Sequence, residues 1–193
     1  SDDKRGEAWN FFQIRDCNYF LDQVLPKYEA GQITGSEANI RHYIGEVYML
    51  RAYAYFQKLQ DIGDCPIIET ALPDVEETLV EASKRRPRHM VARFILSDLD
   101  KAISFLSDKT PGGKNRISKD AAYLLRSRVA LYEGTWLKHH DGTAFVPGGP
   151  GWPGSDSEGY NAQTEISYFL GEAMKSAKVV GDKMVGNLVN NTD

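Results

Sequence analysis

The sequence predicts an all-α protein built from antiparallel helix pairs, and three observations lead to this prediction. Apolar residues recur at every third or fourth position over five long segments, which is the period of a helix with one buried face. Glycine and proline interrupt the chain between these segments. The sequence contains no long run of alternating apolar and polar residues, the pattern of a half-buried strand.

The first two segments are expected to form two helices separated by Gly31 and Gly35. The first covers about residues 9–28, and its predicted inward side chains are Trp9, Phe12, Cys17, Phe20, Val24 and Tyr28. The second covers about residues 37–61, and Thr34 with Glu37 matches a capping box at its start. Its predicted inward stripe is Ile40, Ile44, Val47, Arg51, Ala54 and Lys58, widened by Tyr43, Tyr55, Leu59 and Ile62. Arg51 is expected to pair with an inward carboxylate, either Asp98 or Glu46.

A polar connector follows the second helix. Gly63 and Pro66 end the helix, because glycine permits the turn and proline cannot continue a helix. Ile67 and Ile68 are expected to be extended, and residues 69–84 to form an acidic connector with room for one helical turn.

Three more helices are predicted. They cover about residues 87–106, residues 119–139 after Ser118 as N-cap, and a segment after Asn161 as N-cap. Their predicted inward residues are Val91, Phe94, Ile95, Asp98, Ala102 and Ile103; Ala121, Ala122, Leu125, Val129, Tyr132 and Trp136; and Ile166, Phe169, Leu170, Ala173, Ala177 and Val180. Small residues facing large ones predict stacked hairpins, a tetratricopeptide-like right-handed superhelix with long loops. Neither hairpin matches the full tetratricopeptide consensus.

Composition narrows the classes of partner. The net charge of −4 gives no reason to expect nucleic acid, which needs a basic face. The basic cluster at residues 84–88 is interpreted as local charge balance with the acidic run at residues 74–81, in a surface connector. No stretch approaches the ~18 apolar residues of a membrane span. Cys17 and Cys65 are interpreted as buried small hydrophobic residues, with a disulfide between them left open.

Three ordered segments carry more than helix patterning. They are residues 45–68, with GEVYMLRAYAYFQKL and IGDCPII; residues 95–103, with ILSDLDKAI; and residues 116–135, with RISKDAA and RSRVALYEGT. In order and spacing they resemble the RagB/SusD family of outer-membrane nutrient-binding lipoproteins. The resemblance spans about residues 9–180 and covers the N-terminal, tetratricopeptide-like part of such proteins. We therefore interpret residues 1–193 as a single helical SusD-like N-terminal region of a longer protein.

The resemblance implies a function without catalysis and without a cofactor. Such proteins capture oligosaccharides, or sometimes peptides, at the cell surface of Bacteroidota and deliver them to a SusC-type TonB-dependent outer-membrane transporter. Membrane contact would come only through a lipid anchor that lies outside this chain. We expect glycan capture by the intact protein and little or none by this segment alone. The alternative is a tetratricopeptide-like scaffold that binds protein partners without touching a glycan.

The loop at residues 141–160 is the candidate ligand site. Sugars bind flat aromatic rings through their C–H faces and use amides and carboxylates for their hydroxyl groups. The loop is rich in glycine and proline, and long loops of this kind in compact domains are often functional. Its candidate ligand-binding residues are Trp152, Tyr160, Phe145, Asp156 and Asn161. In the competing interpretation, Trp152 folds back to fill a gap between helices or packs on a part of the protein outside this chain.

The sequence offers no catalytic or metal-binding pattern. His139 and His140 point about 100 degrees apart on a helix, so they are interpreted as helix-end cations and not as metal ligands. Asp98 and Asp100 also point apart, whereas a glycosidase needs two converging carboxyl groups. A helical glycoside hydrolase is therefore the weakest of the three hypotheses.

Overall fold

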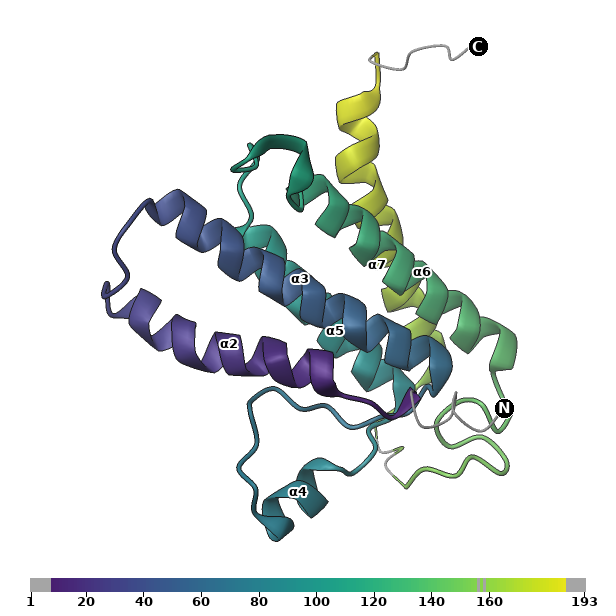
Figure 1. Cartoon of the computed structure of the whole chain (residues 1–193). Coiled ribbons are helices and arrows are strands. Elements are labelled where there is room, and N and C mark those ends of the chain that lie inside the picture. The colour runs from purple at the N-terminus through teal and green to yellow at the C-terminus, as the bar shows by residue number, and fades with distance from the viewer. Residues whose placement is uncertain (1–7, 156, 158, 187–193) are drawn as a thin grey trace.

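The protein is all-α, as predicted (Figure 1). The computed structural model describes residues 8–155, 157 and 159–186. Within these residues the helices are α2 (Phe12–Glu29), α3 (Glu37–Asp61), α4 (Glu76–Ala82), α5 (Arg88–Phe105), α6 (Lys119–His140) and α7 (Ala162–Met184), with a 3-10 turn at Gly113–Asn115. The β structure of the described part is one isolated bridge between Cys65 and Arg86. None of the described helices is long and apolar enough to cross a membrane.

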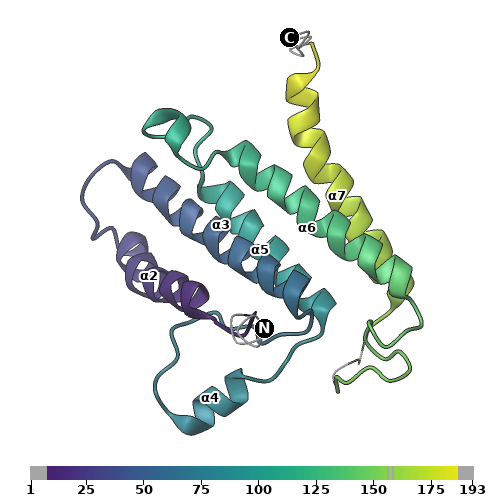
Figure 2. The same ribbon diagram turned by 45° about the vertical axis from the view of Figure 1, so that its right-hand side comes forward.

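The helices form two antiparallel hairpins that stack side by side. α3 pairs with α5, α6 pairs with α7, and α5 packs against α6 between the two hairpins (Figures 1 and 2). α2 packs on the free side of α3, while α4 lies in the connector apart from the bundle. This is the predicted tetratricopeptide-like arrangement.

Two glycines let the paired helices approach closely. A Cβ atom on Gly45 of α3 would lie 2.9 Å from the backbone N of Leu106, and one on Gly134 of α6 would lie 2.9 Å from Cδ2 of Leu170. Real Cβ atoms essentially never come this close to other heavy atoms. Gly134 is thus one of the small residues that allow the α6–α7 hairpin to pack.

The helix caps were predicted with one error. Ser118 accepts a hydrogen bond from the N–H of Ala121, and Asn161 accepts one from the N–H of Thr164, as expected of N-cap residues. The predicted capping box at Thr34 is wrong. Ser36 caps α3 instead, because its Oγ lies within 3.4 Å of the N–H of Asn39, whereas Thr34 lies two residues too early and is exposed.

The predicted inward face of α2 is also partly wrong. Trp9 and Phe12 are 41% and 70% exposed, and the buried residues of this helix are Ile14, Asn18 and Leu21. Asn18 is buried because its Nδ2 donates to the backbone O atoms of Ile68 and Thr70, so a polar residue outside the predicted stripe anchors the connector.

Two smaller corrections concern the other helices. Tyr43 on α3 is 41% exposed, although it was expected to widen the inward stripe. On α7, Ala177 is exposed and Ser176 is buried in its place, because the Ser176 Oγ accepts a hydrogen bond from Arg126 of α6.

Buried arginine–carboxylate pairs join the helices. Arg51 of α3 binds both carboxylate oxygens of Asp98 on α5, at 2.7 and 2.8 Å, and also donates to Oδ1 of Asn18 at 2.7 Å. Of the two partners predicted for Arg51, Asp98 is confirmed; Glu46 pairs with Arg116 instead. Such two-pronged pairs fix the relative orientation of two helices.

The surface interpretation of the basic cluster is wrong for Arg88. This residue is buried and its guanidinium binds the fully buried carboxylate of Glu133 on α6, with distances of 2.9 to 3.1 Å. Lys84 does pair locally with Glu81 at the surface, as local charge balance predicts.

Both cysteines are free thiols. Cys65 is buried as predicted, and Cys17 is half-buried. Burial raises the pKa of the Cys65 thiol to about 12.

Candidate functional site

The loop at residues 141–160 folds back against the end of the bundle where α3 finishes and α5 begins (Figure 1). Gly149 is required for this fold, because a Cβ atom there would lie 1.8 Å from the backbone O of Thr143. A hydrogen bond of 2.7 Å from the Thr143 hydroxyl to the backbone O of His140 continues from the end of α6 into the loop. Residues 140–152 therefore hold a defined shape at one end of the bundle.

Trp152 is the residue that ties this loop to the helices. Its indole Nε1 donates a hydrogen bond of 2.9 Å to Oδ2 of Asp64, just after the end of α3. The other carboxylate oxygen of Asp64 accepts the backbone N–H of Arg88 at 2.8 Å, at the start of α5. One carboxylate thus connects the loop, α3 and α5.

The half-buried Trp152 ring lies between two cavities. One, of about 440 Å³, is lined by Trp152 together with Asp64, Arg85 and Pro87. The other, of about 400 Å³, is lined by Trp152 together with Phe145, Trp136 and Arg88. Both volumes lie within the range of small-ligand sites.

An aromatic cluster forms one wall of the second cavity. The ring of His140 lies 4.4 Å from that of Trp136 and 5.2 Å from that of Phe145. The guanidinium of Arg88 lies 4.0 Å above the Trp136 ring, and Glu133 holds it there. His140 therefore packs in an aromatic wall at the end of α6. No group of three or more potential metal ligands is found in the part of the chain that the structure describes.

The predicted ligand residues are placed differently from one another. Phe145 is 61% exposed and lines a cavity together with Trp152. Tyr160 points inward: its ring lies 4.9 Å from that of His89, and among the described residues its buried hydroxyl finds no hydrogen-bond partner. Burial raises the pKa of this hydroxyl to about 12. Asn161 is exposed and serves as the N-cap of α7, and Asp156 lies outside the described residues.

Three residues of this site were missed by the sequence analysis as ligand candidates. Trp136 was assigned to the buried side of its helix, Arg88 to a surface charge cluster, and Asp64 to a helix-ending turn. The signal in the sequence is Trp136 itself, an aromatic residue in the last turns of α6, shortly before the loop. Together with Trp152 and Phe145 they combine flat rings with charged groups, which is the chemistry that binds a polyhydroxylated ligand.

Known proteins with similar sequences identify the family. A family model described as SusD-like, "Starch-binding associating with outer membrane", matches residues 1–131. The chain belongs to this SusD-like family. A curated relative, SusD-like protein P2 of Formosa agariphila, is 29% identical over 117 residues, which are 61% of this chain and 23% of that protein.

Solved structures of SusD-like proteins share the fold. A SusD-like protein of Bacteroides fragilis is 30% identical, with a TM-score of 0.58 over 72% of this chain and 26% of that one. A laminarin-binding SusD-like protein is 25% identical, with a TM-score of 0.54 over 66% of this chain and 26% of that one. The chain thus spans about a quarter of the length of these relatives.

Proposed function

We propose that this SusD-like chain takes part in the non-catalytic capture of an oligosaccharide at the outer membrane. The observation that carries the proposal is the Trp152 ring, held by Asp64 between two cavities and flanked by Phe145 and Trp136. Aromatic rings held in a fixed orientation at the edge of a cavity bind sugar C–H faces at little entropic cost. The family description, starch-binding, and the laminarin-binding relative support a glucan as the ligand.

Delivery of the captured sugar to a SusC-type TonB-dependent transporter is the second part of the proposal. We also propose that a lipid anchors the intact protein at the cell surface. In this proposal the chain is the N-terminal helical region of a longer protein. The support is family membership. Co-purification of the intact protein with an outer-membrane TonB-dependent transporter from its own cells tests it, and recovery of the protein without any transporter contradicts it.

The glycan proposal is tested by affinity electrophoresis and isothermal titration with starch and laminarin. Trp152→Ala in the intact protein should weaken binding by about three- to tenfold, the loss of one aromatic contact. Tyr53→Ala is the matched control, since Tyr53 is an exposed aromatic residue on α3. Equal binding by Trp152→Ala and the control would reject the loop as the site.

The same variants separate the alternative function. If the intact protein retains no glycan from a broad panel but still binds the transporter, the chain is a protein-interaction scaffold. Release of reducing ends from starch or laminarin would instead show an enzyme and contradict the non-catalytic proposal.

A further inference from the structure

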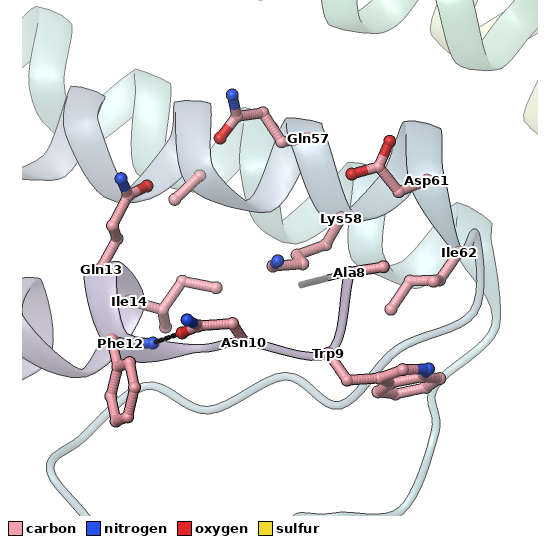
Figure 3. A pocket seen from close by; sticks show the side chains of 11 residues that line it. Ala8, Trp9, Asn10, Phe12, Gln13, Ile14, Gln57, Lys58, Asp61 and Ile62 are labelled. Atoms are coloured by element: carbon pink, nitrogen blue, oxygen red, sulfur yellow. Dashed lines mark hydrogen bonds between the residues drawn. The ribbon is translucent and has the colours of Figure 1, made fainter. Parts of the chain in front are cut away.

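A separate cavity of about 910 Å³ lies between the segment that leads into α2 and the C-terminal half of α3 (Figure 3). Its lining combines one indole ring with amide and charged side chains: Trp9, Asn10, Gln13, Gln57, Lys58 and Asp61. Trp9 was predicted to lie on the hydrophobic face of its helix, but the residue is 41% exposed. An exposed indole beside several hydrogen-bonding groups resembles a sugar site more than a core surface.

Two polar side chains of this cavity, Gln57 and Asp61, are available to a ligand. In Figure 3 the amides of Asn10 and Gln13 extend from one wall, while Gln57 and Lys58 extend from α3 on the other. The Oδ1 atom of Asn10 accepts the N–H of Phe12 at 2.9 Å, which fixes that side chain at the cavity edge. Across the described residues, the side chains of Gln57 and Asp61 make no hydrogen bond or ion pair. Amides and carboxylates of this kind can pair with sugar hydroxyl groups.

This cavity adjoins the Trp152 site. Asp61 and Ile62, at the end of α3, line both the 910 Å³ cavity and the 400 Å³ cavity. Arg85 supplies a second connection: it lines both cavities beside Trp152, and its guanidinium lies 4.6 Å above the Trp9 ring. The exposed Trp9 and the half-buried Trp152 are therefore linked around the end of α3 by shared lining residues.

We infer that the 910 Å³ cavity at Trp9 and the 400 Å³ cavity at Trp152 form one extended groove for a glucan chain of several sugar units. One subsite lies at Trp152 and a second at Trp9. The inference rests on the proposed function and sharpens it, because it makes chain length the basis of selection. A short oligosaccharide covers one ring, whereas a longer chain covers both and gains the second contact without a second association cost.

The test is the dependence of affinity on chain length, measured by isothermal titration of the intact protein. The probes are di-, tetra- and hexasaccharides of the malto and laminari series, together with starch and laminarin. Trp9→Ala and Gln57→Ala should each weaken hexasaccharide binding about three- to tenfold and leave disaccharide binding unchanged. Tyr19→Ala on the exposed side of α2 is the aromatic control, and Gln23→Ala is the amide control. Circular dichroism and thermal melting confirm that each variant is folded.

The outcomes separate this inference from the proposed function. Affinity that rises with chain length in the parent protein, with the gain lost in Trp9→Ala but kept in Tyr19→Ala, supports the groove. Binding that Trp152→Ala weakens, but that neither depends on chain length nor changes in Trp9→Ala, overturns the groove and leaves the proposed function standing. No binding of any oligosaccharide or polymer overturns both.

Discussion

The indole Nε1 of Trp152 donates a hydrogen bond of 2.9 Å to Oδ2 of Asp64, although 88 residues separate the two in the chain. This contact holds a loop of glycines and prolines against the helices. It also fixes the orientation of the ring that we propose to bind sugar. The same carboxylate accepts the backbone N–H of Arg88, so the order of the loop and the start of α5 depend on one side chain.

The first prediction follows from this shared acceptor. Asp64→Ala should lower the free energy of unfolding by about 1–3 kcal/mol, because two donors lose their acceptor. Amide hydrogen exchange of residues 141–160, measured by mass spectrometry, should become faster. Asp61→Ala is the matched control, since that exposed carboxylate makes no hydrogen bond or ion pair with the described part of the protein. Equal exchange in both variants would show that Asp64 does not hold the loop.

The second prediction concerns the buried pair of Arg88 and Glu133. Glu133→Ala leaves the guanidinium buried without its partner and should destabilise the protein by about 3–5 kcal/mol in urea unfolding. The double variant Arg88→Met with Glu133→Leu removes both charges and should recover most of this loss. A double variant as unstable as the single one would contradict the view that the buried charge is the cause.

The third prediction compares two glycines of the α6–α7 hairpin. Gly134→Ala should destabilise the protein by about 1–3 kcal/mol, because its Cβ would meet the side chain and backbone of Leu170. Gly171→Ala meets nothing within 4 Å and should stabilise the protein by up to about 1 kcal/mol through helix propensity. Thermal unfolding of the two variants should therefore shift in opposite directions; a shift in the same direction would mean that the hairpin is packed less tightly.

Local features of the fold could be predicted from the sequence. Ser118 and Asn161 were identified as N-caps because a cap needs only a side chain and an amide three residues away. Thr34 failed under the same rule, since a second candidate, Ser36, stands two residues closer to the helix. The helical periods gave the type and order of the long helices for the same local reason.

Partners far apart in the chain could be predicted only in part. The pairing of Arg51 with Asp98 was anticipated because both residues lie on predicted inward stripes. Arg88 was misplaced, because a run of basic residues predicts a surface, and the carboxylate that draws this one inward lies 45 residues away. Trp9 was misplaced because helical period identifies a face but not the element that covers it. The candidate site depends on such contacts, so Trp152 and Phe145 were found from the sequence, whereas Trp136 and the charged groups Asp64 and Arg88 were missed.

The last prediction concerns pH and Glu172 on α7. Its carboxylate accepts a hydrogen bond from Lys175 at 2.7 Å and pairs with Arg126 of α6 at 2.8 Å. The hydrogen bond from Lys175, together with that from Arg126, lowers the pKa of Glu172 below its ordinary value of 4.5. Since the folded pKa is below the unfolded one, this group stabilises the fold above pH 4.5. The contribution is lost as the pH falls through the folded pKa.

Glu172→Gln should therefore be less stable than the parent chain at neutral pH, by about 1 kcal/mol, because one member of the pair is largely exposed. The difference should shrink as the pH falls below 4.5, where the parent carboxylate also takes up its proton. Urea unfolding of both proteins from neutral to acidic pH measures this directly. Lys175→Gln should reproduce part of the neutral-pH loss and add little in the Glu172→Gln background, since both changes remove the same hydrogen bond. A stability difference that stays constant with pH would show that the glutamate acts through packing and not through its charge.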